Sequence, residues 1–227
     1  MGIPVRVDHT VDEQVEALFA RVVKEEHDRL DILVNNAWGG YERMENYDAP
    51  VWEQPIWRWD VMFDTSARAS FVASRLAVPL LRLHAQQRPG LIAITGYLDH
   101  DATQCRHIAS VAKLAANGLG YLLAKEVWDH NIAVLTVSPI GPIHEWVWGG
   151  EELHEVYDAL RTPDGLAALH QKHPNRVGQS PEYTGRAVAM LAADPHVMAK
   201  TGQGFKVRDL AAEYDFTDID GRRPRHD

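Results

Sequence analysis

The spacing of apolar residues along the chain predicts strands and helices in alternation. Residues 3–8 alternate with a period of two and are rich in Val and Ile, as in a strand. Residues 10–27 carry apolar side chains at helical spacing, after a capping box formed by Thr10 and Glu13. Short apolar runs predict further strands at residues 31–35, 91–95, 132–138 and 204–207. Helical spacing predicts further helices at residues 59–84, with a bend near Pro79, at 108–128, and from Pro181, which follows a capping Ser180.

This alternation predicts a parallel sheet with helices on both of its faces, since βαβ units place consecutive strands parallel. The strands are almost continuously apolar, as strands buried on both sides are. We find no internal repeat and no linker. We therefore expect a single α/β domain over residues 1–227, with a loop-and-helix insertion at about 142–178.

Composition narrows the class of protein. The chain has 227 residues, 45% of them hydrophobic and 24% charged, and a net charge of −9 without a block of like charges. These values speak against nucleic acid or an anionic membrane as the main partner. The single cysteine, Cys105, excludes an intrachain disulfide. No apolar run reaches the length of a membrane span, and no leader precedes the first predicted strand, so we expect a cytoplasmic protein.

Several short motifs occur in order along the chain. Residues 31–40 read DILVNNAWGG, and the C-terminal part contains SPEYTGR at 180–186, AADP at 192–195, DLAAEY at 209–214 and DIDGR at 218–222. With these motifs the chain resembles the short-chain dehydrogenase/reductase (SDR) superfamily, and in particular its dehydrogenase/reductase type 1-like group, from about residue 3 to 224. The resemblance implies a Rossmann-like, three-layer α/β/α fold with a mostly parallel sheet.

The resemblance also identifies a part of the family fold that this sequence lacks. Family members begin with a strand, a Thr-Gly-x-x-x-Gly-x-Gly turn and a helix that together hold the cofactor pyrophosphate. Here residues 3–8 match the third strand of the family, and no Gly-x-Gly-x-x-Gly occurs in the chain. We therefore expect the first βαβ unit of the family to be lacking and no cofactor to bind. The resemblance makes Asp8, Asn35 and Ala37 remnants of a cofactor site.

Without the first two strands of the family, residues 3–8 would lie about 10 Å from their nearest neighbour in the sheet, at ~4.8 Å between strands. We expect residues 3–8 to pair instead with residues 31–35 through a right-handed crossover. Alternatively, a second chain fills the gap. The long helices at 59–84 and 108–128 resemble those that pair in family oligomers, which implies a homo-oligomer or a complex with a full-length homologue.

The resemblance places four catalytic positions on the sequence. Lys113 matches the family lysine, whereas Ala109, Gly96 and Ser66 occupy the positions of the tyrosine, serine and asparagine. A positioned general acid contributes roughly 100- to 10,000-fold in rate, and Ala109 has no group to supply it. We therefore expect classical hydride-transfer chemistry to be lost.

The remaining polar residues near these positions offer other chemistry. Lys113 has the potential to act as a base or an amine nucleophile, His100 and His107 as an acid–base pair, and Tyr97 through its phenol. The alternatives are an inherited lysine, solvated loop histidines and a packed aromatic ring. His100, Asp101 and His107 have no recognised ligand spacing, so no metal site is expected.

A substrate pocket is expected beside these groups. Small side chains at Gly96 and Ala109 would enlarge it. Further lining residues would suit a flat or hydrophobic ligand or would simply pack as core, namely Trp38, His144, Trp146 and Trp148.

Three functions remain open on the sequence. The first is a cofactor-independent enzyme of lyase, isomerase or cyclase type, acting on a small, partly apolar metabolite in the vacated nicotinamide pocket. The second is a non-catalytic pseudoenzyme or partner subunit of a full-length homologue. The third is an NAD(P)-dependent oxidoreductase whose true start lies upstream of Met1.

Overall fold

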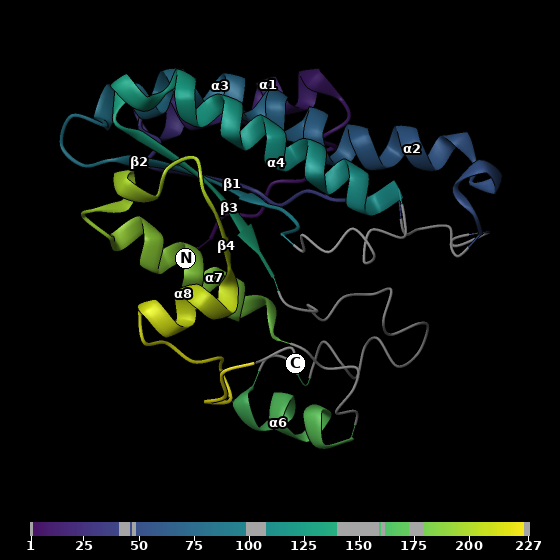
Figure 1. Ribbon diagram of the computed structural model, residues 1–227. Coiled ribbons are helices and arrows are strands. Elements are labelled where there is room, and N and C mark those ends of the chain that lie inside the picture. The colour runs from purple at the N-terminus through teal and green to yellow at the C-terminus, as the bar shows by residue number, and fades with distance from the viewer. Residues whose placement is uncertain are drawn as a thin grey trace. The chain divides into compact units, whose positions relative to one another are not determined.

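The computed structural model describes residues 2–40, 46, 49–98, 108–139, 159, 162–172 and 179–224 (Figure 1). The strands are β1 (Ile32–Asn35), β2 (Gly90–Thr95), β3 (Ile132–Ser138) and β4 (Gly204–Lys206). The helices are α1 (Asp12–Glu25), α2 (Ile56–Phe63), α3 (Ala69–His84), α4 (Ile108–Glu126), α6 (Pro163–Lys172), α7 (Pro181–Ala193) and α8 (Val207–Glu213). Short turns of 3-10 helix occur at Val51–Glu53, Trp128–His130 and Val197–Lys200.

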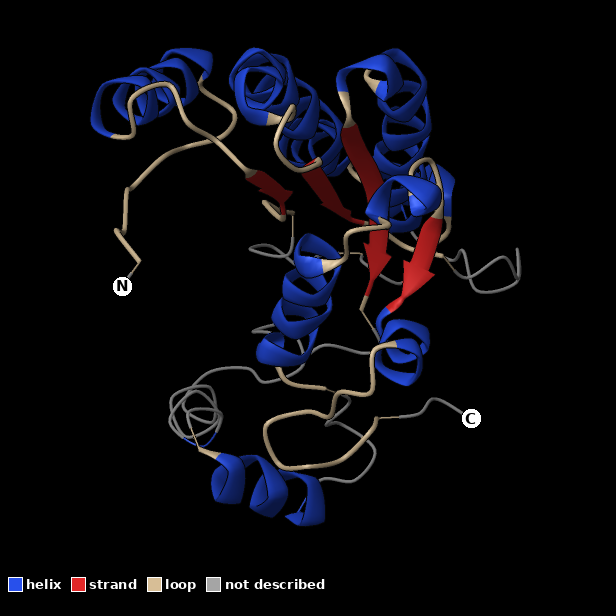
Figure 2. Cartoon of the chain, turned by 90° about the vertical axis from the view of Figure 1, so that its left-hand side faces the viewer, coloured by secondary structure: helices blue, strands red, loops and turns tan. Residues whose placement is uncertain are grey.

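The four strands form one sheet in the order β1-β2-β3-β4 (Figure 2). β1 and β2 are parallel, with Ile32 opposite Leu91 and Asn35 opposite Ile94. Every residue of β2 and β3 is buried, as expected for apolar strands in the interior of a parallel sheet. The predicted Rossmann-like α/β fold is confirmed.

Helices α1, α3 and α4 cover the same face of β1 and β2 (Figure 1). A single apolar cluster joins them to the strands and includes Phe19 from α1, Ala77 from α3, Ala116 from α4 and Ile92 from β2. This packing holds α4 against β2. It therefore sets the position of the first turns of α4 relative to the end of that strand.

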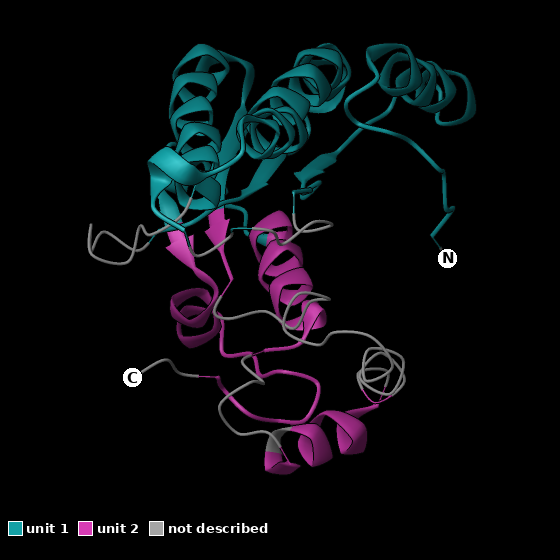
Figure 3. Ribbon diagram, turned by 90° about the vertical axis from the view of Figure 1, so that its right-hand side faces the viewer, with its two compact units in different colours: residues 1–136, 194–204 teal, residues 137–193, 205–227 magenta. Residues whose placement is uncertain are grey.

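The chain divides into two compact units (Figure 3). The first contains residues 1–136 and 194–204, and the second contains residues 137–193 and 205–227. The insertion expected at about 142–178 includes α6, but most of it lies outside the described residues. The single-domain organisation therefore stays a prediction.

The predicted strand at residues 3–8 is wrong. These residues have no regular secondary structure, and Ile3 and Val5 are 63% and 41% exposed. The segment instead leads into α1 through a turn held by side chains. The backbone N–H of Asp8 donates to Gln14 Oε1, while Asp8 Oδ1 accepts from the N–H and the hydroxyl of Thr10. Alternation alone does not form a strand when no neighbouring strand accepts its backbone hydrogen bonds.

The same contacts displace the predicted capping box. Val11 is the N-cap of α1 and its side chain makes no capping hydrogen bond. Thr10 is engaged by Asp8, two residues before it, because short polar side chains readily bond to nearby backbone and hydroxyl groups.

The long helix predicted at 59–84 is interrupted at a different place from the predicted one. Pro79 lies inside α3, and the irregularity is a π-helical turn at Asp64–Arg68, between α2 and α3. Two hydroxyl groups accompany this turn. Thr65 donates to the carbonyl of Val61 at 2.7 Å, and Ser66 donates to the carbonyl of Ala112 in α4 at 3.1 Å.

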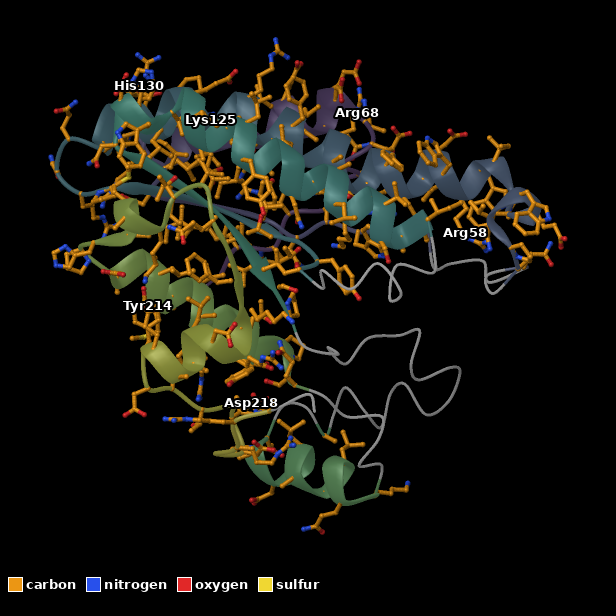
Figure 4. All side chains as sticks on the ribbon, viewed as in Figure 1. Arg58, Arg68, Lys125, His130, Tyr214 and Asp218 are labelled. Carbon is orange, nitrogen blue, oxygen red and sulfur yellow. The ribbon has the colours of Figure 1, made fainter. Side chains whose placement is uncertain are left out.

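In the second unit, the start of α7 is fastened to a buried carboxylate, Asp218, which Figure 4 labels. The hydroxyl of Ser180 donates to one oxygen of Asp218, and the N–H of Ser180 donates to the other at 2.8 Å. The N–H of Tyr183 in turn donates to the Ser180 hydroxyl at 3.2 Å. The predicted cap at Ser180, followed by a helix from Pro181, is confirmed.

Candidate active site

Lys113 lies where α4 passes the carboxyl end of β2. Its Nζ donates to the carbonyl oxygen of Thr95, the last residue of β2, at 3.2 Å. The same nitrogen lies 4.3 Å from the centroid of the Trp38 ring, which belongs to the loop after β1. Two adjacent strand ends and one helix therefore meet at this amine. The carboxyl ends of parallel strands are where α/β proteins place their ligand sites.

The surroundings of Lys113 favour its neutral form. Burial lowers the pKa of the Lys113 ammonium from 10.5 to about 8, because the charged form is poorly solvated there. No ion pair between described residues includes it. The Trp38 ring acts in the opposite direction, since an aromatic face attracts a cation. Both protonation states are thus accessible near neutral pH.

Asn117, one helical turn after Lys113, is part of the site and was not among the predicted residues. Its Nδ2 donates to the carbonyl of Tyr97 at 2.6 Å. Its Oδ1 is buried, and no described group donates a hydrogen bond to it. Lys113 and Asn117 thus hold the carbonyls on either side of Gly96. Their spacing of four residues on a largely apolar helix was the signal in the sequence that marked them as neighbours.

Gly96 does not enlarge the pocket. A Cβ at this position would lie 2.0 Å from Asn117 Oδ1 and 2.4 Å from Thr136 Cγ2. The volume that a side chain would fill is therefore occupied from α4 and β3. The prediction was wrong because the sequence alone does not show that Asn117 and Thr136 occupy this space. Contact of Gly96 with a substrate stays a prediction.

Ala109 lies one turn before Lys113 and is packed as core. It belongs to an apolar cluster with Met62, Ile108 and Ala112, against which Trp38 also packs. The hydroxyl of Ser66, at the family position of the asparagine, is committed to the carbonyl of Ala112. The π-helical turn that carries Ser66 is of a kind often found at functional sites.

Asn35 is bonded inside the first unit. Its Nδ2 donates to the Ser74 hydroxyl at 3.0 Å, and its carbonyl accepts from the Thr95 hydroxyl at 3.2 Å. It therefore links β1 to both α3 and β2.

A cavity of about 610 Å³ lies next to Trp38. It brings together the predicted residues Asp8, Ala37 and Trp38, and its lining is completed by Arg6, Val7, His9, Gln14 and Thr65. The hydrogen bonds from Thr10 hold the pKa of Asp8 below its usual value, so this carboxylate stays charged at neutral pH.

The remaining predicted site residues are Tyr97 and five residues that the structure does not describe. His100, His107, His144, Trp146 and Trp148 lie outside the described residues. Tyr97 is described, and its backbone carbonyl is the group that contacts Asn117. The catalytic and substrate-binding roles of all six stay predictions. Within the described ranges, no group of three or more His, Cys, Asp or Glu side chains is placed to hold a metal ion. No helix in the same ranges is both long enough and apolar enough to cross a bilayer.

Comparison with known proteins identifies the family. Residues 2–207 match the family model described as enoyl-(acyl carrier protein) reductase. The chain is 30% identical over 224 residues to mouse dehydrogenase/reductase SDR family member 1, covering 97% of this chain and 68% of the relative. The chain belongs to the short-chain dehydrogenase/reductase superfamily.

Solved structures show the same fold. A short-chain dehydrogenase of Mycobacterium thermoresistibile matches with a TM-score of 0.70 at 19% identity, covering 96% of this chain and 68% of that one. The L-sorbose reductase of Gluconobacter frateurii, complexed with NADPH and L-sorbose, matches with a TM-score of 0.66 at 22% identity, covering 89% and 73%.

These findings correct the expected function. The family model and the mouse relative are those of reductases and dehydrogenases, so they contradict a cofactor-independent lyase, isomerase or cyclase. They also conflict with the expectation that no cofactor binds, since members of this family usually use NAD(P). The expectation relied on Ala109 and Gly96, which lack the family side chains. Lys113 is present, and it contacts the end of β2 and the Trp38 ring in the loop after β1.

Proposed function

We propose that the protein is an NAD(P)-linked oxidoreductase that interconverts a small carbonyl compound and its alcohol. The observation that carries this proposal is the position of Lys113, a family residue held by the end of β2 and by the loop after β1. Membership of the superfamily and the NADPH of the sorbose reductase support it.

The residues present fit part of the cofactor. The cavity that includes Asp8, Ala37 and Trp38 has a charged acceptor and an apolar wall, which suit a ribose hydroxyl and a base. The Gly-rich sequence with which the family grips the pyrophosphate does not occur in residues 1–227. The described residues thus fit a nucleoside and provide no pyrophosphate cradle. When bound, the nicotinamide would supply or accept a hydride.

Calorimetric titration of the full-length protein with NADH and NADPH tests the proposal. We expect micromolar binding of at least one nucleotide, followed by turnover of members of a panel of ketones, aldehydes and alcohols. Asp8→Asn keeps an acceptor for Thr10 but removes the charge, and it should weaken nucleotide binding about tenfold. Glu16→Ala, an exposed change within α1, is the control. Absence of both binding and turnover would contradict the proposal.

We also propose that the protein acts in the cytoplasm as a homo-oligomer that pairs through α3 and α4. These helices expose large apolar side chains, among them Phe71, Leu114 and Leu122 at 51%, 45% and 53%. We propose that these exposed side chains form the pairing surface, since large exposed apolar areas mark interaction sites. Sedimentation of the purified protein should show a dimer or larger species, which Leu122→Glu should dissociate. A monomer, or association only with a full-length homologue, would contradict it.

A further inference from the structure

We infer that Lys113 itself exchanges the proton with the substrate oxygen, in the reaction for which position 109 has no acid or base. The inference rests on the proposed oxidoreductase function and names a catalytic residue for it. The Lys113 amine is held in place by contacts to two other segments, the end of β2 and the loop after β1.

Positions 109 and 113 lie on one face of α4. Residues four apart on a helix lie on the same face, one above the other. Ala109 is 7% exposed within its apolar cluster, so position 109 itself offers no polar group. The next turn of the same face presents the Lys113 amine. Within α4, Lys113 is the ionisable residue nearest in sequence to position 109.

The Lys113 ammonium has more N–H donors than its bond to Thr95 uses. An ammonium has three N–H donors. The carbonyl of Thr95 accepts one of them, and this bond anchors the nitrogen at the end of β2. Two donors remain for a substrate oxygen and for solvent, so anchoring and proton transfer do not compete.

Two opposing effects act on the protonation of Lys113. The apolar surroundings disfavour the ammonium, and the Trp38 ring at 4.3 Å favours it. Burial lowers the pKa of Lys113 to about 8, near working pH, where a general acid or base is most effective. An exposed lysine with its usual pKa of 10.5 would hold its proton too tightly to serve as a base at neutral pH.

Reduction and oxidation use the two protonation states of Lys113. In reduction, the carbonyl carbon receives a hydride, which a reduced nicotinamide nucleotide would supply, and the carbonyl oxygen receives a proton from the Lys113 ammonium. The substrate becomes an alcohol, Lys113 becomes a neutral amine, and the amine regains a proton from solvent. In oxidation, the neutral amine accepts the proton of the alcohol hydroxyl and later returns it to solvent, while the alcohol carbon loses a hydride, which an oxidised nicotinamide nucleotide would accept.

The closing experiment has one readout that needs no substrate. In protein with ¹³C- and ¹⁵N-labelled lysine, the Lys113 side-chain resonances should titrate near pH 8. Lys125, exposed on the same helix and labelled in Figure 4, supplies a reference signal in the same spectra. Lys113→Met identifies the Lys113 resonance. Titration of Lys113 near its usual value of 10.5 would overturn the inference.

The second readout is kinetic. Lys113→Ala should lower kcat by roughly 100- to 10,000-fold, with nucleotide binding measured separately. The pH-rate profile should lose its break near pH 8. Small primary amines should restore part of the activity of Lys113→Ala, in proportion to their basicity, because they replace the missing proton carrier. A merely structural lysine would give no such dependence. Lys125→Ala should keep full activity, and Tyr97→Phe tests the competing phenol.

The outcomes separate the two proposals. Nucleotide binding and turnover that survive in Lys113→Ala with an unchanged pH profile would overturn the inference and leave the oxidoreductase function standing. Loss of activity in Tyr97→Phe with rescue by phenols would have the same effect. Absence of both nucleotide binding and turnover in the unmodified protein would overturn both.

Discussion

The carboxamide oxygen of Asn117 lies 2.0 Å from the point at which the Cβ of any side chain at position 96 would stand. Asn117 therefore excludes a side chain at position 96. The Nδ2 of Asn117 is bonded to the carbonyl of Tyr97, so its amide group has little freedom to turn away. The end of β2 and the third turn of α4 are packed against each other.

Replacing Gly96 by Ser, the family residue, should lower the free energy of unfolding by about 1–3 kcal/mol, because overpacking forces neighbouring side chains from their positions. Urea unfolding followed by circular dichroism measures the loss. Gly118→Ala is the control, since nothing lies within 4 Å of its added methyl group in α4. That change should instead stabilise the helix by roughly 0.5–1 kcal/mol.

A double-mutant cycle identifies the cause of that loss. Asn117→Ala removes the colliding oxygen, so Gly96→Ala should be better tolerated beside it than in the unmodified protein. We expect a coupling energy of about 0.5–3 kcal/mol. Strictly additive losses would show that the contact with Thr136 alone limits position 96.

The stability of the protein should rise between pH 8 and 10.5 through Lys113. Its folded-state pKa is lowered to about 8 from 10.5, so between these values the unfolded chain binds more protons than the folded one. The penalty for burying the ammonium is complete below pH 8 and disappears as pH rises above it. Lys113→Met should abolish this rise, which denaturant unfolding at a series of pH values would measure. A rise of equal size in Lys113→Met would assign it to other groups.

The start of α7 should depend on the pair formed by Ser180 and Asp218. Ser180→Ala should lower the free energy of unfolding by about 1–3 kcal/mol, because it removes the hydroxyl that links Asp218 to the N–H of Tyr183. Asp218→Ala should have a larger effect, since three hydrogen bonds to its carboxylate would lose their acceptor. Asp209→Ala, an exposed change in α8, should leave stability within about 0.5 kcal/mol. Equal stabilities for all three variants would contradict this assignment.

The ion pair between Arg68 and Asp12 ties α1 to the π-helical turn. Both Nη atoms of Arg68 donate to the Asp12 carboxylate at 2.8 Å, and this contact holds the pKa of Asp12 below 3.8. Arg68→Ala should raise the pKa of Asp12 toward 3.8, as followed by carboxyl NMR. The stabilisation from this pair is present above pH 3.8 and is lost as pH falls through the folded-state pKa. Because both side chains are more than 40% exposed, high salt should reproduce much of the effect, whereas Arg82→Ala should not.

The sheet and its helices could be predicted because their signals are local. β2 and β3 are apolar at nearly every position and bounded by turns, and Ser180 followed by Pro181 marks a helix start. The signal at residues 3–8 was just as regular, but a strand also needs a partner, and partners are not encoded in the segment itself. The π-helical turn was missed because its hydroxyl contacts, such as Ser66 to Ala112, join positions far apart in the sequence.

The candidate site could likewise be predicted from the sequence only in part. Lys113 could be located from the sequence through the family motif, and the structure brings its Nζ to 4.3 Å from the Trp38 ring centroid. Their shared role in a site stays a prediction. The sequence shows that position 96 has no side chain, yet the group that fills the space, Asn117, lies 21 positions later and has an ordinary helical neighbourhood. The family motif shows which side chains are absent from the sequence, but it does not show which other residues fill their space.

The position of β1 at one side of the sheet has a consequence for hydrogen exchange. Within the described part of the chain its only strand neighbour is β2, and Ile32 and Val34 are 37% and 45% exposed. Amides of β3, between two strands and fully buried, open only in rare unfolding events, whereas those of β1 need only a local opening. Deuterium uptake should therefore be faster in β1 than in β2 or β3, so the edge that carries Asn35 and leads to Trp38 opens before the interior of the sheet.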